Sequence, residues 1–182
     1  MILTRLVAGS RDDVALAVDL ANTWETLEPP NERLRDVGSL RRVLEHHGHA
    51  EAAGAATDRD VAAARVLRDR LRDAFVAADE EKAVASLNEL LARAPAPRLV
   101  RDGRTWRFGW DESTPAFLVP TTATALLEAI RRDGFERFGI CRGTPCTGVF
   151  VDRSRNRSRR YCCELCADRV AQARSRGRRR PD

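Results

Sequence analysis

The spacing of hydrophobic residues along the chain predicts helices for most of its N-terminal part. The clearest pattern follows a Thr57-Asp58 cap and places an apolar stripe at helical spacing. The stripe consists of Val61, Ala64, Val66, Leu67, Leu71, Phe75 and Val76. Helices are expected over residues 37–45, 60–78, 80–93 and 121–132. Residues 12–27 also have a helical pattern, but their apolar positions alternate too closely to settle the period.

The period of the pattern changes after residue 97. The segment RLVRDGRTWRFGW alternates on both sides of Asp102-Gly103, which is a strong hairpin signal. Leu99, Trp106 and Phe108 would share one side of this ribbon or face the helices. Residues 135–140 are expected to be extended and to lead into the first cysteine. The expected fold class is therefore α+β, with a mostly helical N-terminal domain that includes a β-hairpin, followed by a small C-terminal module.

The composition is typical of a globular, soluble protein. Of the 182 residues, 43% are hydrophobic and 32% are charged, and the length permits one sizeable domain plus a small module. No apolar run approaches the ~20 residues that a membrane span needs. Arg5, Asp12 and Asp13 interrupt any signal-peptide core, so a cytoplasmic location is expected, where disulfides are uncommon.

Positive charge is concentrated at the C-terminal end. Residues 141–182 contain twelve arginines and four acidic residues, a balance of +8, whereas the net charge of the whole chain is only +5. The larger N-terminal part is therefore slightly acidic. A basic segment beside an acidic body indicates that one end of the molecule binds a polyanion.

All five cysteines lie close together in the sequence. Cys141 and Cys146 have the spacing C-x4-C, and Cys162 and Cys166 have the spacing C-x3-C. Each spacing lets a tight turn aim two thiolates at one point about 2.3 Å away, and two such turns complete a tetrahedron around zinc. Because Cys163 and Cys166 would form C-x2-C, spacing alone does not decide between Cys162 and Cys163. A short strand, GVFVD, and a polar turn, SRNRS, would form a small hairpin that brings the pairs together.

Two other chemistries would use the same cysteines. An iron–sulfur cluster is less favoured because nothing in the sequence resembles an electron-transfer site, and a disulfide pairing would leave an odd thiol. Structural zinc is favoured, and a closed four-sulfur shell has no open position for catalysis. One zinc ion would contribute on the order of 10–16 kcal/mol to a module with too little apolar surface for its own core.

The C-terminal sequence resembles a known family. From Cys141 the order is C-x4-C-x3-F-x-D-x-S-x-N-x-S-R-R-Y-C, followed by a further C-x-x-R. This order resembles the CGNR-type zinc finger, a module of bacterial proteins that carry an N-terminal ABATE domain and are regarded as stress-induced transcription regulators. Leu20-Ala21-Asn22-Thr23 resembles the Asn-Thr signature of that domain. The resemblance implies a ligand-sensing domain over residues 1–135 and a zinc finger over 136–182.

The resemblance also implies which cysteines are ligands. In such modules the cysteine directly after Arg-Arg-aromatic binds the metal, which is Cys162 here and makes Cys163 the spare. The implied zinc ligands are Cys141, Cys146, Cys162 and Cys166. The name-giving Cys-Gly-Asn-Arg reads Cys166-Ala167-Asp168-Arg169 in this chain, so an anion replaces an amide at Asp168.

The arginines of the module indicate binding to nucleic acid. A helix after Cys162 would place Arg169 and Arg176 on one face, next to further arginines that can neutralise phosphates. The predicted nucleic-acid-binding residues are Arg153, Arg155, Arg157, Arg159, Arg160, Arg169, Arg174 and Arg176. The sequence thus predicts a transcription regulator that binds double-stranded DNA and senses a small ligand or protein. A homodimer is reasonable because one short module binds weakly. The alternative is a zinc-stapled module that binds an acidic protein or RNA.

For the other candidate residues, structural or solvent-exposed positions are favoured over functional sites. His46, His47 and His49 form HHGH, for which a solvated helix end is favoured over a metal site. The acidic pairs Asp12-Asp13 and Glu80-Glu81 fit helix starts better than a catalytic dyad. The sequence has no nucleophile motif, glycine-rich phosphate loop or H-E-x-x-H, so an enzyme is not expected.

Two hypotheses give aromatic and thiol groups a function. Trp24, Trp106 and Trp110 could line a ligand pocket, although a role in the core is favoured. A free Cys163 thiol among arginines could act as a redox trigger that ejects zinc, although a passive residue is favoured.

Overall fold

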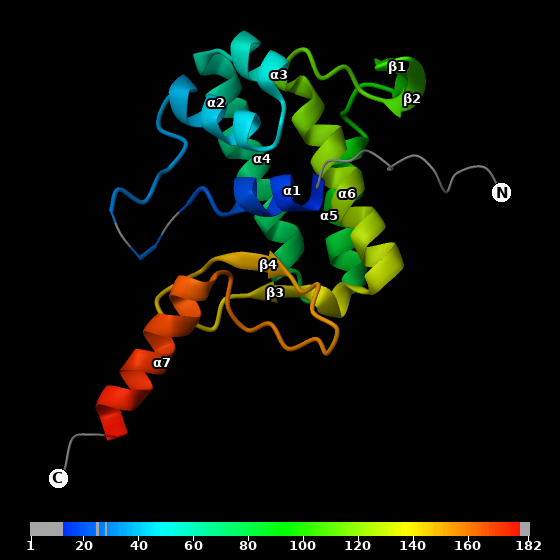
Figure 1. Cartoon of the computed structure of the whole chain (residues 1–182). Helices are drawn as coiled ribbons and strands as arrows, with labels where there is room; N and C mark the ends of the chain where they lie inside the picture. Colours follow the sequence, from blue (N-terminus) through cyan, green and yellow to red (C-terminus); the bar gives the residue numbers. More distant parts are fainter. Residues whose placement is uncertain (1–12, 25, 28, 179–182) are drawn as a thin grey trace.

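Helices build most of the chain up to residue 133 (Figure 1). The computed structural model describes residues 13–24, 26–27 and 29–178, so Arg5 and Asp12 lie outside the described residues. The helices are α1 (Asp13–Ala21), α2 (Val37–His46), α3 (Ala50–Ala55), α4 (Asp58–Val76), α5 (Glu80–Leu91) and α6 (Leu118–Asp133). None of the helices described is long and apolar enough to cross a bilayer.

The predicted helix after Thr57 is confirmed as α4, which is capped at its start. The Asp60 carboxylate accepts hydrogen bonds from the backbone N–H (2.8 Å) and hydroxyl (2.6 Å) of Thr57. The expected apolar stripe is wrong at two positions, because Val66 and Val76 are 65% and 54% exposed. The 3.6-residue period turns them away from the buried face, where the structure places Arg68 and Ala74 instead.

The last helix of the body begins earlier than expected. A 3-10 turn, η2 (Pro115–Phe117), leads directly into α6 at Leu118, and Pro120 is accommodated because the first helical turn needs no N–H partner. Gly134 follows the helix with φ +89°, a conformation that favours glycine. The extended segment expected over 135–140 is wrong in its first half, which forms a second 3-10 turn, η3 (Phe135–Arg137).

Leucine and alanine side chains of the six helices form one core. α1 packs against α4 and α6, while α5 packs against the same two helices. The largest fully buried side chains of the helices are Phe117, Leu16, Leu20, Leu40, Leu44, Leu71, Leu87 and Leu126. A buried arginine ties the loop before α2 to this core, since Arg68 contacts both oxygens of Glu32 at 2.8 Å.

The first hairpin is confirmed, and it lies at one end of the helical body (Figure 1). Its strands, β1 (Arg98–Asp102) and β2 (Thr105–Gly109), pair antiparallel, with Leu99 opposite Phe108. Leu99, Trp106 and Phe108 share one side of the ribbon, as the alternation predicts. The alternative that they face the helices is wrong, because these side chains are 59%, 59% and 47% exposed.

The second hairpin, at the opposite end, differs from the expected one (Figure 1). Its strands are β3 (Phe138–Ile140) and β4 (Val149–Val151), with Ile140 opposite Val149. The loop of this hairpin is therefore the segment that carries the first cysteine pair. The polar segment SRNRS forms a turn, but no strand follows it before the last helix, α7 (Glu164–Arg178). The fold class is confirmed as α+β: a mostly helical body with one small hairpin, and a C-terminal module in which the second hairpin is followed by a helix.

The cysteine hairpin packs directly on the helical body. Val149 and Val151 are buried in the same core cluster as α1 and α4. The Asn22 side chain donates to the Val149 carbonyl (2.9 Å) and accepts from the Val149 N–H (2.8 Å), as a neighbouring strand would. Arg72 of α4 donates to the carbonyls of Ala21 (3.0 Å) and Thr147 (2.8 Å), bridging the two parts.

Replacing Asn22 with alanine is expected to lower the free energy of unfolding by about 1–3 kcal/mol, because a partly buried N–H and C=O of β4 lose their partner. Denaturant unfolding of the zinc-loaded chain measures this change. Asn88→Ala on the exposed side of α5 is the matched control, with an expected change within about 0.5 kcal/mol. Equal stabilities of the two variants would contradict the role given to Asn22.

Candidate metal centre

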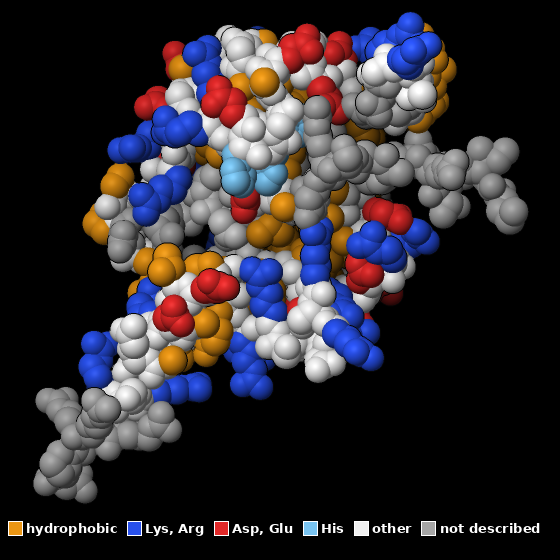
Figure 2. Space-filling view, in the orientation of Figure 1, with side chains coloured by type: hydrophobic (Ala, Val, Ile, Leu, Met, Phe, Trp, Pro, Cys, Tyr) orange, Lys and Arg blue, Asp and Glu red, His pale blue; other side chains and the backbone are white. Residues whose placement is uncertain are grey.

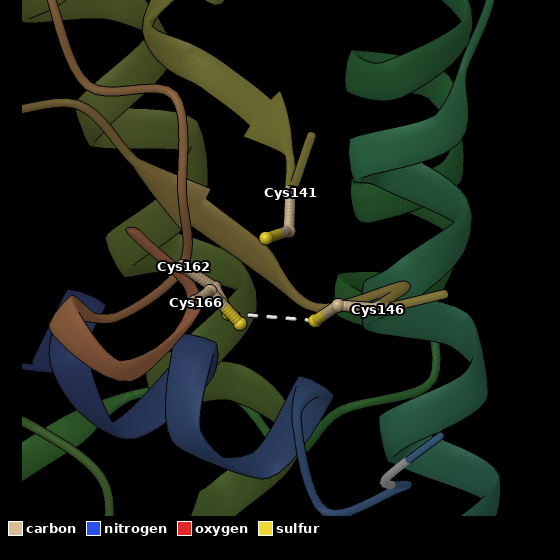
Figure 3. Close-up of side chains that lie close together, drawn as sticks. All are labelled: Cys141, Cys146, Cys162 and Cys166. Carbon is tan, nitrogen blue, oxygen red and sulfur yellow. Dashed lines mark hydrogen bonds between the residues drawn. The ribbon is translucent and has the colours of Figure 1, made fainter. Parts of the chain in front are cut away.

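Four of the five cysteines converge on one point (Figure 3). Cys141 directly follows β3, Cys146 lies in the same hairpin loop, Cys162 precedes α7 and Cys166 lies in its first turn. Their four sulfur atoms all lie within 4.8 Å of one another. The cluster is therefore built from two segments that are separated in sequence, as the spacing predicts.

The sulfur separations fit a tetrahedral metal. The Sγ atoms of Cys146 and Cys162 are 3.6 Å apart, and those of Cys162 and Cys166 are 3.7 Å apart. A tetrahedron with zinc–sulfur bonds of about 2.3 Å has edges of roughly 3.8 Å, whereas a disulfide brings two sulfurs to about 2.05 Å. The cysteines are free thiols. The donor set therefore suits one zinc ion, held by four sulfurs with no open position.

Two glycines in the hairpin loop shape its contact with sulfur. The N–H of Gly143 donates to Cys141 Sγ (3.4 Å), and the N–H of Gly148 donates to Cys146 Sγ (3.3 Å). A Cβ atom on Gly148 would lie only 2.8 Å from Cys162 Sγ, while one on Gly143 would have its nearest neighbours at 3.5 Å. Only glycine therefore fits at position 148, a requirement that the sequence pattern did not indicate.

Burial and mutual contact work against ionisation of the thiols. Burial raises the pKa of Cys166 to about 12, and burial followed by contact with Cys146 raises the pKa of Cys162. Burial also acts against ionisation of Cys141, but the backbone N–H groups of Cys162 and Gly143 lower its pKa overall. A bound divalent cation offsets part of the negative charge of four thiolates and favours their ionised form, so metal binding at neutral pH is coupled to proton release.

A hydrogen-bonded turn leads from β4 to the second cysteine pair. The buried Asp152 accepts from the N–H groups of Ser154 (2.7 Å) and Arg159 (2.9 Å). Ser158 N–H in turn donates to Ser154 Oγ (2.9 Å), so the polar turn predicted for SRNRS is held by these hydrogen bonds. Although burial opposes it, these hydrogen bonds lower the pKa of Asp152, which keeps the turn intact at neutral pH.

Some of the predicted nucleic-acid-binding arginines hold the module together. Arg159 donates to the carbonyls of Tyr161 (3.0 Å) and Cys162, and its guanidinium lies over the Phe150 ring. Arg169 donates to the Gly143 carbonyl (3.0 Å) across the metal centre. Arg157 pairs with Glu136 (2.6 Å). By contrast, the exposed side chains of Arg155, Arg160, Arg174 and Arg176 face solvent.

Cys163 lies outside the metal cluster. Its side chain is exposed, and its Sγ atom is 3.9 Å from that of Cys162 but does not belong to the group of four. Of the two adjacent cysteines, Cys162 thus points into the metal cluster and Cys163 is exposed outside it. The redox role of Cys163 stays a prediction.

The histidine and tryptophan candidates lie elsewhere. His49 is buried, contacts Glu112 at 3.1 Å and stacks on Phe117, so the expected solvated position is wrong for this residue. The tryptophans occupy three different environments. Trp24 lies beside Arg68, Trp106 lies on the exposed ribbon, and Trp110 donates to the Pro95 carbonyl (2.9 Å).

Replacing Cys162 with serine is expected to remove most of the one zinc ion per chain, because a hydroxyl does not supply the required thiolate. Cys163→Ser is the matched control and is expected to keep the full zinc content. Elemental analysis of the purified full-length variants measures both. Retention of zinc by Cys162→Ser together with its loss from Cys163→Ser would exchange the two roles.

Gly148→Ala is expected to weaken zinc binding at least tenfold, because its Cβ would displace the Cys162 sulfur. Gly143→Ala tests the same loop with a methyl group that fits, and should bind zinc within about threefold of the unchanged chain. Competition with a zinc chelator gives both affinities. Similar affinities for the two variants would show that the loop relaxes around either methyl group.

Two family models match the chain, one over the helical body and one over the segment with the cysteines. A family model named ABATE, described as "Putative stress-induced transcription regulator", matches residues 14–133. A second model, the CGNR zinc finger, matches residues 137–179 and contains all four clustered cysteines. Both families are of the regulator or zinc-finger type. A search of curated proteins found no match. The chain therefore belongs to the ABATE family and carries a C-terminal CGNR zinc finger.

Proposed function

We propose that the chain is a DNA-binding transcription regulator. In this proposal the zinc finger, residues 136–182, contacts the duplex, and the helical domain, residues 1–135, senses a small ligand or a partner. The zinc ion has a structural role, which is to hold the basic surface of the module in one shape. The family descriptions support a regulatory role, and the geometry of the module supports contact with a polyanion.

The observation that carries the proposal is the projection of α7 away from the body (Figure 1). Cys166 anchors its first turn at the metal, whereas residues 171–174 and Arg176 are exposed. Beyond its anchored first turn the helix is largely polar and exposed, and a partner that covers such a helix would stabilise it. At 15 residues it is about 22 Å long, and a helix of this diameter fits the major groove of DNA.

The exposed arginines make the surface of α7 and of the turn before it positively charged. Lys and Arg side chains follow α7 and the nearby turn on the face seen in Figure 2. Arg155 and Arg160 lie in the turn before the helix, and Arg174 and Arg176 lie on the helix itself. Each can contact a phosphate, and such contacts supply affinity that falls steeply with salt. The arginines that bond to the module's own carbonyls, Arg159 and Arg169, orient this surface in the proposal.

An exposed leucine favours the alternative function. Leu165 in the first turn of α7 is 79% exposed, which is unusual for a large apolar side chain beside a structural metal. Contact with a protein or with unstacked RNA bases would cover it. Duplex DNA remains the preferred partner in this proposal because the helix presents the exposed cations Arg174 and Arg176 beyond its first turns, where they can contact phosphates.

The double variant Arg174→Ala/Arg176→Ala is expected to bind duplex DNA at least tenfold more weakly at about 0.1 M salt. Each lost phosphate contact should also reduce the slope of log affinity against log salt by about 0.9. Arg42→Ala/Arg59→Ala on the helical body removes equal charge from exposed positions and is expected to change neither quantity. Gel shifts with the zinc-loaded chain measure both over a salt series.

The same experiment separates the two functions. Parallel lanes contain a duplex, a structured RNA of equal length and no nucleic acid. Retention of RNA alone would support the alternative, and failure to retain either at low salt would overturn nucleic-acid binding. Equal losses in the two double variants would show that overall charge, rather than the α7 surface, controls binding.

A further inference from the structure

A second group of metal-ligating side chains lies on the helical domain, away from the cysteines. Asp19 of α1 and His46 and His47 at the end of α2 place one ligand atom each within 4.8 Å of the others. The Nε2 atom of His47 is 2.9 Å from Asp19 Oδ2. Histidine side chains are exposed beside an acidic one on the face shown in Figure 2. The group is therefore accessible to an ion from solvent.

The backbone holds the two histidines at a fixed helix end. His46 is the last residue of α2 and His47 is its C-cap. Gly48, with φ +79°, turns the chain so that its N–H donates to Glu45 O (2.9 Å) and that of His49 donates to Leu44 O (2.8 Å). These two bonds form a Schellman motif, which requires the left-handed conformation that glycine supplies.

Both ends of this arrangement are anchored in the core. Leu44, two residues before His46, is fully buried, and His49 is buried against Phe117. On the opposite helix, Leu16 and Leu20 flank Asp19 and are also fully buried. The three ligand groups are thus carried by elements that packing holds in place, which is the condition for a defined metal site.

The donor set selects a class of ion. Two imidazole nitrogens and one carboxylate oxygen suit divalent transition metals, whereas calcium and magnesium prefer all-oxygen sites. With bonds of about 2.1 Å, neighbouring ligand atoms are roughly 3.0–3.4 Å apart. The His47–Asp19 pair already has nearly this separation, and the exposed His46 ring, 5.0 Å from that of His47 between centroids, closes the set by rotating its side chain.

We propose that Asp19, His46 and His47 form a second site, for a divalent transition-metal ion, and that this ion is the ligand sensed by the helical domain. The sensing half rests on the proposed function. Asp19 lies one helical turn before Asn22, whose side chain pairs with Val149 in the hairpin of the zinc centre. An ion that draws α1 and α2 together therefore acts on the helix that positions the zinc finger.

The test uses the untagged, zinc-loaded full chain and Ni²⁺ as the probe. Isothermal titration is expected to show one bound Ni²⁺ per chain, with elemental analysis showing that the zinc content does not fall. His46→Ala and Asp19→Asn are each expected to bind Ni²⁺ at least tenfold more weakly. Glu45→Gln, an exposed neighbour on the same helix, is the matched control and should bind as the unchanged chain does.

Two readouts separate the site from its role. No Ni²⁺ binding, or equal binding by the His46→Ala and Glu45→Gln variants, would overturn the site and leave His47 and Asp19 as a hydrogen-bonded pair. If the site binds, Ni²⁺ is expected to change duplex affinity at least threefold in the unchanged chain and not in His46→Ala. Binding of Ni²⁺ without this change would overturn the sensing role. Failure of every form to bind DNA would overturn the proposed function, while the titration still decides the metal site.

Discussion

Mutual repulsion among four closely spaced thiolates is the constraint on which the C-terminal part of the molecule depends. The Cys162 sulfur lies 3.6 Å from that of Cys146 and 3.7 Å from that of Cys166, and burial raises the pKa of Cys162 and Cys166. Such a cluster is compatible with ionised thiols only when a cation neutralises them. The metal therefore supplies the attraction that joins the hairpin loop to α7, in a segment whose own apolar surface is small.

The zinc finger is not an independent appendage, because its hairpin shares a core with the helical domain. Val149 and Val151 pack in the core together with side chains of α1. The Asn22 side chain forms two hydrogen bonds with the backbone of Val149 in β4, as a neighbouring strand would. Arg72 adds a bridge from α4 to the cysteine loop. A short chain of hydrogen bonds therefore connects α1 and α4 to the strand and loop that carry the first cysteine pair. Asn22 of the Asn-Thr signature therefore connects the helical body to the hairpin of the zinc finger.

Local patterns predicted the features that depend on local physics. Helix period, the Thr57 cap, the Asp102-Gly103 turn and the cysteine spacings all act within a few residues, and each appears in the structure. Apart from Val66 and Val76, which the helix period turns outward, most of the failures involve partners that are distant in sequence. Because β4 pairs with β3, the hairpin loop is the cysteine segment before β4 and not the polar turn after it. Gly148 is required only because the Cys162 side chain packs against it. The buried positions of Arg68 and His49 likewise follow from contacts with Glu32 and Phe117 that no local pattern encodes.

The departure from the family's name-giving residues can be understood from the same geometry. Cys166 is fully buried at the metal, and the Arg169 guanidinium bonds to the Gly143 carbonyl of the opposite loop. The cysteine and the arginine of the name-giving motif, which this chain keeps, thus both contribute to the centre. Asp168 between them is exposed, so an anion there leaves the metal site intact and instead changes the charge that the outer surface presents. Because its side chain is exposed, the aspartate at this position is compatible with the geometry of the metal centre.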